Sequence, residues 1–349
     1  MNAATASSTG AVAGLLAGLH VVDLTRNLPG PFCTRMLADL GATITKVEPP
    51  EGDPSRPLGP LFDALNHGKE CRRIDFRQPA DLDQLRGWLA DADVMVDSFR
   101  PGILQSLGLD FERLKAINPK LVMVSITGYG QHGPWAQRAG HDLNFMALSG
   151  ALDQMRAPTG ELALSNVQWG DMAGGSSMAC IAILAAVFSA QRCGAGRHLD
   201  VSMVHGVHAH LVLPKATATL FTPLLGRAPG AGEDLLNGGL PCYNLYATAD
   251  SRHLAVAALE FKFWKAACAV FERPDWVDRH WQRGQMPGSP PNNALRQEVA
   301  ALVATRTLAD WTARFEAADA CVTPVLTLQE AQAHPLFADG FRGQPWAAV

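Results

Sequence analysis

The sequence predicts an α/β protein, with a Rossmann-like doubly wound parallel sheet domain followed by a smaller α+β domain. Over the first 130 residues, short apolar runs rich in β-branched residues alternate with helical patterns. Strand–helix–strand units of this kind imply parallel strands with right-handed crossovers. After residue 241, two strand-like runs follow one another around a turn, which is typical of an antiparallel pair.

The first strand–helix–strand unit sets the pattern for the sheet. A strand over 19–24 leads to a Pro/Gly turn at 28–31, and a helix over 32–40 ends at Gly41, a favourable residue for a helix C-terminus. Residues 48–61 are rich in Pro and Gly and are predicted to form a loop. The remaining strands are predicted at 42–47, 72–76, 94–96, 121–126 and 198–201, and the remaining helices at 82–90, 111–117, 172–192 and, after residue 201, as far as 213.

Proline and glycine are frequent over 223–241, which predicts a linker into the second domain. The domain prediction is a frayed N-terminus (1–18), a large domain (19–222), a small domain (223–325) and a C-terminal segment (326–349). Within the small domain, strands are predicted at 243–246 and 254–258 and helices at 263–271, 293–305 and 308–317.

Composition limits the classes of partner. Of 349 residues, 48% are apolar and 18% charged, which favours a well-packed enzyme over a disordered binder. The net charge of −4 gives no general attraction for nucleic acid or an anionic membrane. Residues 1–18 lack the basic start of a signal peptide, and the apolar run over 178–188 is too short to span a bilayer. We therefore expect a cytoplasmic protein with no nucleic-acid or membrane partner.

Two kinds of bound group are disfavoured. No G-x-G-x-x-G motif follows the first strand and no P-loop occurs, which argues against nicotinamide, flavin and nucleoside triphosphates. The seven cysteines form no C-x-x-C pair and are expected to be reduced thiols. His205, His208 and His210 have no Asp, Glu or Cys beside them and do not keep to one helix face, so no metal site is predicted.

Two glycine-flanked segments carry candidate proton-transfer residues. His141 lies within 139–145 and Asp171 within 170–175, and each precedes an apolar run with helical character. His141 could be a structural histidine and Asp171 a helix N-cap, since both roles are common at such positions. Together they fit a site that forms an enolate or attacks a thioester, because a helix N-terminus stabilises negative charge on a substrate oxygen.

Basic residues near strand ends suggest either a phosphate site or a solvated basic rim. Arg100 ends a strand in the segment 99–102, at the edge of the sheet where ligands bind in such folds. Glu260 closes an apolar strand just before an aromatic helix start, where it is either functional or only a helix-start carboxylate. The other basic candidates are Lys46, Lys69, Arg72, Arg73 and Arg77.

These motifs resemble the class III CoA-transferase (CaiB/BaiF-like) superfamily, and within it the α-methylacyl-CoA racemase branch. The resemblance runs from Gly18 to about His334. The matching segments are 28–31, 38–42, 46–50, 99–102, 139–144, 170–171, 237–243, 259–264 and 320–325. The resemblance implies a Rossmann-like domain without the nucleotide fingerprint, a small domain, and two chains interlocked as a homodimer.

The resemblance also implies roles for three residues. In transferases of the superfamily, the aspartate at the place of Asp171 becomes acylated as a mixed anhydride. In its racemases that aspartate is one of two bases, the histidine at the place of His141 is the other, and a glutamate at the place of Glu260 supports the histidine. Transferases commonly lack a basic residue where His141 stands, so the presence of His141 and Glu260 favours a racemase.

By the same resemblance, no cofactor is needed beyond the CoA moiety of the substrate. Two arginines common in the family are replaced here by Pro49 and Ser106, so Arg56, Arg72 or Lys69 would have to compensate in binding phosphate. The family usually continues past 349 into a tail that packs on the large domain, so a short variant is expected. The CoA contacts map onto Ile74, Asp75, Phe76, Arg77, Ser98, Phe99, Arg100, Gly140, Asp142, Leu143, Asn144 and Phe145.

The resulting hypothesis is a racemase or epimerase of 2-methylacyl-CoA thioesters. One base removes the α-proton, and the other returns a proton to the opposite face of the enolate. The alternative is a CoA-transferase that uses Asp171 as nucleophile. A third hypothesis is a member without catalysis that binds CoA thioesters as a scaffold subunit. The sequence leaves the acyl group open.

Overall fold

The computed structural model describes residues 14–156, 160–230 and 232–338. The described residues form two compact units. The first contains the chain up to Ala151 together with Ser165–Leu211, and the second contains Leu152–Leu164 and the chain from Val212 onward. The predicted C-terminal segment lies outside the described residues from 339 onward, as do residues 1–13 of the predicted N-terminal segment.

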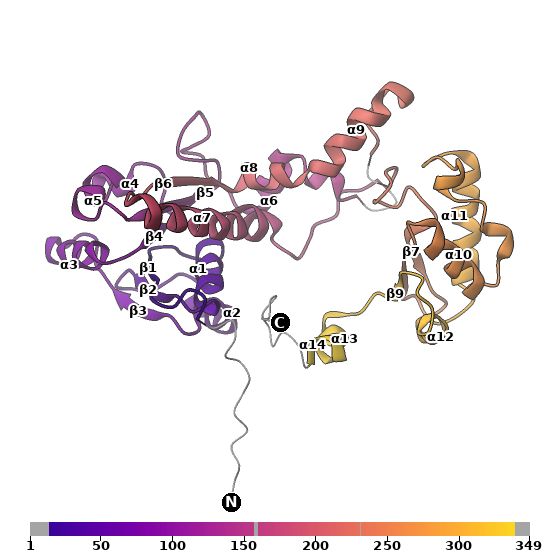
Figure 1. The fold of residues 1–349 in the computed structure, drawn as a ribbon, viewed down its shortest axis with the longest axis horizontal. Coiled ribbons are helices and arrows are strands. Elements are labelled where there is room, and N and C mark those ends of the chain that lie inside the picture. Colours follow the sequence, from indigo (N-terminus) through magenta and orange to yellow (C-terminus); the bar gives the residue numbers. More distant parts are fainter. Residues whose placement is uncertain (1–13, 157–159, 231, 339–349) are drawn as a thin grey trace, which may run out of the picture. The chain divides into compact units, whose positions relative to one another are not determined.

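The first unit is built on a six-stranded parallel sheet in the order β3-β2-β1-β4-β5-β6 (Figure 1). The doubly wound sheet predicted from the sequence is therefore confirmed, and strand order reverses between β1 and β4. In such sheets ligands bind outside the carboxyl ends of the strands at this reversal. The strands are β1 (His20–Asp23), β2 (Thr43–Glu48), β3 (Glu70–Arg73), β4 (Val94–Asp97), β5 (Val122–Thr127) and β6 (His198–Ser202).

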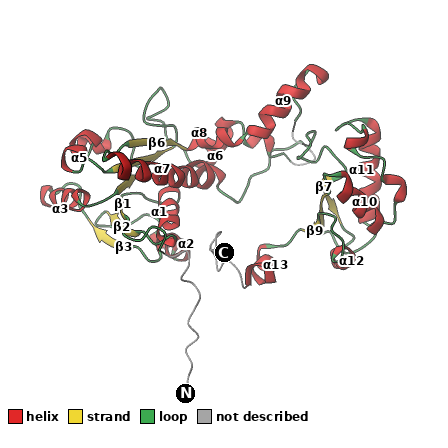
Figure 2. Cartoon of the chain, viewed as in Figure 1, coloured by secondary structure: helices red, strands yellow, loops and turns green. Residues whose placement is uncertain are grey.

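Helices cover both faces of this sheet, which explains why β4 and β5 are buried along their whole length and are mostly apolar. On one face, α1 (Pro29–Asp39) and α7 (Met178–Cys193) bury residues such as Leu37 and Ile183 against the strands. The other face is covered by α3 (Pro79–Ala90), α4 (Ile103–Ser106) and α5 (Phe111–Ile117), which contribute Leu89, Leu104 and Leu114. Figure 2 shows these helices around the strands.

Two local predictions are wrong in part. The predicted loop over 48–61 already contains a 3₁₀ turn at Arg56–Leu58, and α2 (Pro60–Asn66) begins at its end. Proline at the first position of a helix starts it rather than breaks it, since its missing N–H has no intrahelical partner there. The strand predicted at 72–76 lies at Glu70–Arg73, which leaves 74–77 as the loop that follows β3.

The long helix predicted over 172–192 begins as a π-helical segment, η3 (Gly170–Ser177), and continues as α7. The resulting helix, Gly170–Cys193, has 24 residues, a mean hydropathy of 1.8 and 44% of its most apolar window buried. By length and composition alone it could cross a membrane, although the prediction considered only the run over 178–188. This is weak evidence for a span, because a core helix passes the same test, and α7 packs on β5.

The helix predicted after residue 201 is two helices. α8 (Met203–His210) belongs to the first unit together with α6 (Asp142–Ser149), and α9 (Val212–Leu225) belongs to the second. The predicted linker over 223–241 thus begins inside α9, with Pro223 in the last turn of that helix.

The second unit has an antiparallel three-stranded sheet in the order β7-β8-β9. Its core is aromatic, with Trp264, Trp276 and Trp311 fully buried. β9 was not predicted, because it is only three residues long and contains a proline. The elements are β7 (Tyr243–Ala247), β8 (His253–Ala257), α10 (Phe261–Val270), α11 (Pro290–Val303), α12 (Leu308–Phe315), β9 (Val322–Pro324), α13 (Leu328–Ala333) and α14 (Pro335–Ala338).

Candidate active site

A buried ion pair lies where β1 reaches the carboxyl edge of the sheet. Asp23 ends β1, and Lys69, just before β3, places its Nζ 3.3 Å from Asp23 Oδ2 with both side chains fully buried. Thr25 and Thr34 donate hydroxyl hydrogen bonds of 2.5 Å to the same carboxylate. Burial alone would raise the pKa of Asp23, but Lys69, Lys46 and the two hydroxyls lower it to about 2.

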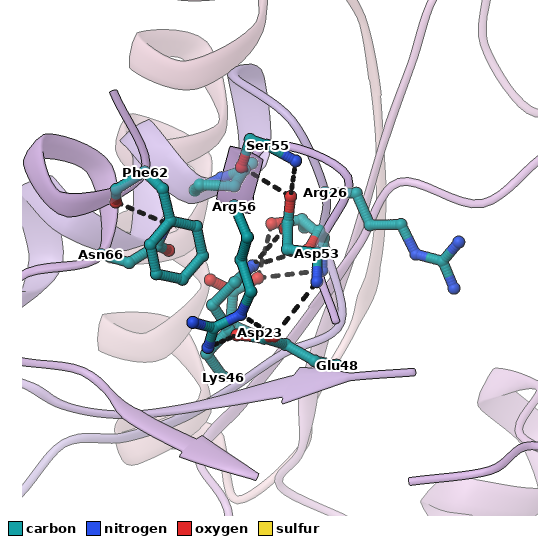
Figure 3. A network of polar contacts seen from close by, with 12 residues as sticks. Asp23, Arg26, Lys46, Glu48, Asp53, Ser55, Arg56, Phe62 and Asn66 are labelled. Atoms are coloured by element: carbon teal, nitrogen blue, oxygen red, sulfur yellow. Dashed lines mark hydrogen bonds and ion pairs between the residues drawn. The ribbon is translucent and has the colours of Figure 1, made fainter. Parts of the chain in front are cut away.

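A second buried pair continues this network (Figure 3). Lys46 on β2 lies 2.9 Å from Asp53 and donates to the Thr25 carbonyl at 3.0 Å. Glu48 accepts two hydrogen bonds from Arg56, at 2.5 and 2.7 Å. The network therefore fixes the loops that follow β1 and β2 against each other, at the edge where a ligand would bind.

For Lys46 and Lys69, the two interpretations made from the sequence, a phosphate site and a solvated basic rim, are both wrong. Both are buried in ion pairs, so they form neither a solvated rim nor a phosphate site. Arg56 is held by Glu48 and Arg72 is paired with Glu70. The three residues expected to compensate for Pro49 and Ser106, namely Arg56, Arg72 and Lys69, therefore all have acidic partners.

An aromatic and cationic group lies at the same edge. Phe76 follows β3 and Phe99 follows β4, and their rings meet edge to face with centroids 5.8 Å apart. Arg26 lies just after β1, and its guanidinium is 5.6 Å from the Phe99 ring centroid. The backbone N–H of Arg26 donates to Ser98 Oγ at 3.3 Å. Figure 3 shows the guanidinium extending away from the buried ion pairs. Arg26 was missed by the sequence analysis, although its place just after the first strand was a usable signal.

The other predicted CoA contacts differ in availability. The Ile74 side chain is fully buried, so only its backbone could meet a ligand. Arg77 is exposed and forms a bidentate pair with Asp75, at 2.8 and 3.0 Å. Arg100 is exposed, and no ion pair is found for it within the described part of the chain.

Asp97, the last residue of β4, is hydrogen-bonded to the loop that contains Phe99. Its carboxylate accepts from the Phe99 N–H at 3.0 Å and from the Ser125 hydroxyl at 2.6 Å. Ser125 Oγ also lies 3.0 Å from Nε2 of His198. Burial is the main cause that raises the pKa of Asp97, to about 7, and Asp200 adds to it.

The two candidate bases come from adjoining helix starts. His141 is the N-cap residue of α6, and Asp171 is the second residue of η3. The Asp171 N–H donates to Oδ1 of Asp142 at 2.9 Å, which ties the two helix starts together. Asn144 Oδ1 accepts from the His141 N–H at 3.1 Å and fixes the backbone of the histidine. The N-cap interpretation of Asp171 is wrong, because the cap position belongs to Trp169.

Close packing holds the π-helical segment in place. A Cβ on Gly174 would lie 2.6 Å from the Met203 carbonyl oxygen, and one on Gly206 would lie 2.1 Å from the Gly174 carbonyl oxygen. Glycine is therefore required where η3 crosses α8. Ser176 Oγ donates to the Pro29 carbonyl at 2.6 Å and approaches the Asp171 carbonyl at 3.0 Å. Such π-helical segments occur frequently at functional sites. No sequence signal marked Ser176.

The surroundings of Asp171 bring its carboxyl group into the range of a working acid or base. Burial first, and the neighbouring Asp142 second, raise the pKa of Asp171 to about 6, while His141 lowers it. A group with a pKa near the operating pH can both accept and return a proton efficiently.

Replacing Asp142 tests this electrostatic arrangement. Asp142→Asn keeps an oxygen for the Asp171 N–H but removes the like charge, so the pKa of Asp171 falls. Any reaction that needs the Asp171 carboxylate is then expected to keep its rate to lower pH. The pH profile of kcat/KM measures the shift, and an acid limb unchanged from that of the wild type would contradict it.

The remaining candidates lie apart from this group in the chain. Glu260 is the N-cap residue of α10 in the second unit, and its side chain makes no capping hydrogen bond. His205 Nδ1 pairs with Ser202 Oγ at 2.7 Å and His210 Nδ1 with the Gly206 carbonyl at 2.7 Å. Within the described residues, no three His, Cys, Asp or Glu side chains gather as metal ligands would.

Comparison with known proteins places this chain in a family. Residues 16–341 match CoA-transferase family III. The chain is 34% identical to human alpha-methylacyl-CoA racemase, over 91% of this chain and 80% of that protein. It is 31% identical to acetyl-CoA:oxalate CoA-transferase of Acetobacter aceti, over 90% and 81%. A solved CAIB/BAIF family protein from Brucella suis is 28% identical, with a TM-score of 0.77 over 93% of this chain and 88% of that chain. The chain belongs to CoA-transferase family III.

Proposed function

We propose that this protein is a racemase or epimerase of 2-methylacyl-CoA thioesters. The observation that carries the proposal is that His141 and Asp171 lie at the adjoining starts of α6 and η3. The pKa of Asp171 is raised there to about 6. The 34% identity to human alpha-methylacyl-CoA racemase supports the same choice within the family.

The proposed reaction is a 1,1-proton transfer. One of the two bases takes the proton from the α-carbon, and the electron pair of the C–H bond delocalises into the thioester carbonyl to give an enolate. The other base then gives a proton to the opposite face of that carbon. The first backbone N–H groups of a helix lack intrahelical acceptors, so the start of α6 can donate to the enolate oxygen. One such donor contributes about 3–4 kcal/mol.

The CoA moiety is proposed to lie at the carboxyl edge of the parallel sheet. Phe76 and Phe99 offer ring faces and edges to its adenine, and the Arg26 and Arg100 guanidinium groups can meet its phosphates. Asp75 and Arg77 already satisfy each other, so Arg77 can meet a phosphate only by leaving this pair. Glu260 is proposed to take the supporting role that the resemblance implies for a glutamate at its place.

A second copy of the chain is the proposed partner. On α7, Ile181 and Phe188 are each 62% exposed and lie seven residues apart, on one helix face. Leu148 on α6 is 53% exposed. Large exposed apolar groups of this kind mark interaction surfaces. Sedimentation is expected to give a dimer, and a monomer at micromolar concentration would contradict this part of the proposal.

The second candidate function is CoA transfer between carboxylic acids. It is favoured by the 31% identity to acetyl-CoA:oxalate CoA-transferase and by the availability of the Asp171 carboxylate as a nucleophile. In that reaction Asp171 attacks the thioester carbonyl, CoA leaves as the thiolate, and a mixed anhydride remains on the protein.

Two assays on the same enzyme separate these functions. A 2-methylacyl-CoA incubated in deuterated buffer is expected to gain deuterium at the α-carbon and to lose its stereochemical purity. Incubation with acyl-CoA and hydroxylamine is expected to leave Asp171 unmodified. Trapped Asp171 with CoA transfer to a free acid, and without α-exchange, would instead establish a transferase. Tight thioester binding with neither reaction would indicate a binding subunit.

A further inference from the structure

The loop that carries Glu260 is hydrogen-bonded on both sides of that residue to one short turn. The turn contains the 3₁₀ segment Trp281–Arg283, preceded by His280. Trp281 Nε1 donates to the Leu259 carbonyl at 2.7 Å. The Phe261 N–H donates to Gln282 Oε1 at 3.0 Å. The two peptide groups that flank Glu260 are therefore both fixed by side chains some twenty positions later in the chain.

The turn is itself anchored in the aromatic core of the second unit. His280 is almost completely buried, stacks on Trp264 with ring centroids 6.3 Å apart, and meets Phe261 at 5.8 Å. Its Nδ1 accepts from the Gln282 N–H at 3.3 Å. Burial is the main cause that lowers the pKa of His280, which favours the neutral ring that can accept this bond. The backbone of Gln282 is thus held to the core of the second unit by its hydrogen bond to His280.

Glu260 itself is exposed and makes no capping hydrogen bond with the helix it precedes. No hydrogen bond or ion pair of its carboxylate is found among the described residues, so the backbone of 259–261 sets the point from which this side chain extends. A functional side chain must be held within about 0.5 Å of its productive place, and a displacement of about 1 Å can lower a rate about 100-fold. The two bonds from the turn fix the backbone from which the Glu260 side chain extends, which is one part of this requirement.

We propose that Trp281 and Gln282 are positioning residues that hold Glu260 in its catalytic geometry. The proposal rests on the function proposed above for Glu260. The turn acts through its two hydrogen bonds to the backbone of 259–261, and no contact with substrate is assigned to it.

If Gln282 served only to stabilise the fold, its replacement would lower Tm and leave kcat unchanged. Gln282 is exposed, and a hydrogen bond at an exposed site contributes little to the free energy of unfolding. The core of the second unit is already packed around Trp264, Trp276 and Trp311. The loss of one surface hydrogen bond should therefore leave stability almost unchanged and act on kcat.

The test combines single and double variants in the full-length enzyme. Gln282→Leu removes the side-chain oxygen that accepts from the Phe261 N–H, and Trp281→Phe removes the indole N–H that donates to the Leu259 carbonyl. Gln282→Glu is the conservative variant, which keeps a side-chain oxygen at this place. Each of the first two is expected to lower kcat for α-hydrogen exchange about 10-fold with little change in KM, and Gln282→Glu is expected to recover most of the rate. Tm is expected to stay near wild type in Gln282→Leu and to fall in Trp281→Phe, because Trp281 packs on the core of the second unit. In a Glu260→Gln background, neither is expected to lower the rate further. The proposal would be overturned if either variant lowered kcat further in the Glu260→Gln background, or if it lowered Tm and left kcat unchanged.

A control and an activity-independent measurement complete the test. Asn293 donates to the Gly288 carbonyl at 3.0 Å in the same unit and is the matched control as Asn293→Leu, which is expected to retain full kcat. Amide hydrogen exchange of Phe261 is expected to accelerate in Gln282→Leu, and unchanged protection would overturn the proposal. If Glu260→Gln exchanges the α-hydrogen as fast as wild type, the assigned function of Glu260 fails instead, even where Phe261 loses protection.

Discussion

Asp171→Asn is expected to lower α-hydrogen exchange about 1,000-fold for the epimer of a 2-methylacyl-CoA whose α-hydrogen faces Asp171, because general acid–base groups contribute about 10²- to 10⁴-fold. The amide is close in shape to the carboxylate but cannot take up the proton. In wild type the pKa of Asp171 is raised to about 6, chiefly by burial, so the carboxylate is available at neutral pH. The measurement is deuterium incorporation at the α-carbon under saturating substrate.

The fold should survive this change. The groups that fix Asp171 are its backbone N–H, bonded to Asp142, and its backbone carbonyl, approached by Ser176. Neither is altered by Asn, so Tm and CoA binding are expected to stay near the wild-type values. Exchange of that epimer at more than a tenth of the wild-type rate would show that another group takes its proton.

Lys69→Met is expected to lower the free energy of unfolding by about 3–5 kcal/mol, the cost of removing one partner of a buried ion pair. Lys69 Nζ lies 3.3 Å from Asp23 and also donates to the Pro31 carbonyl at 2.8 Å and to Asn66 Oδ1 at 3.0 Å. The variant leaves the Asp23 carboxylate buried with its hydroxyl donors but without this cation. Urea denaturation measures the change.

The matched control is Arg72→Met on β3, three residues after Lys69. Arg72 is paired with Glu70, and both side chains are more than half exposed. A surface pair of this kind contributes about 0–1 kcal/mol, so the control should unfold close to wild type. Equal losses in the two variants would mean that burial does not set the strength of the Lys69–Asp23 pair.

Pattern alone was enough to predict the parallel sheet, because its central strands are buried on both faces and are therefore continuous apolar runs. β4 and β5 were placed within one residue of their observed bounds. The errors lie where tertiary contacts decide. Residues 170–177 are π-helical and Gly174 packs against α8, a contact that no local periodicity reveals.

The candidate site was predictable to a similar extent. Glycine-flanked His141 and Asp171 suggested two helix starts, and the structure brings those starts together through Asp142. Burial of Lys46 and Lys69 was not predictable, since lysines at strand ends are usually exposed. Their partners are Asp53, in the loop that follows β2, and Asp23, at the end of β1. The turn that holds the Glu260 loop was equally hidden, because its contacts join residues about twenty positions apart.

The most direct measurement follows each pure epimer of a 2-methylacyl-CoA separately in deuterated buffer. Wild type is expected to exchange the α-hydrogen of both epimers and to interconvert them. His141→Ala is expected to exchange at most the epimer whose α-hydrogen faces Asp171, without inverting it. Exchange of both epimers by His141→Ala at a rate near wild type would contradict the two-base mechanism.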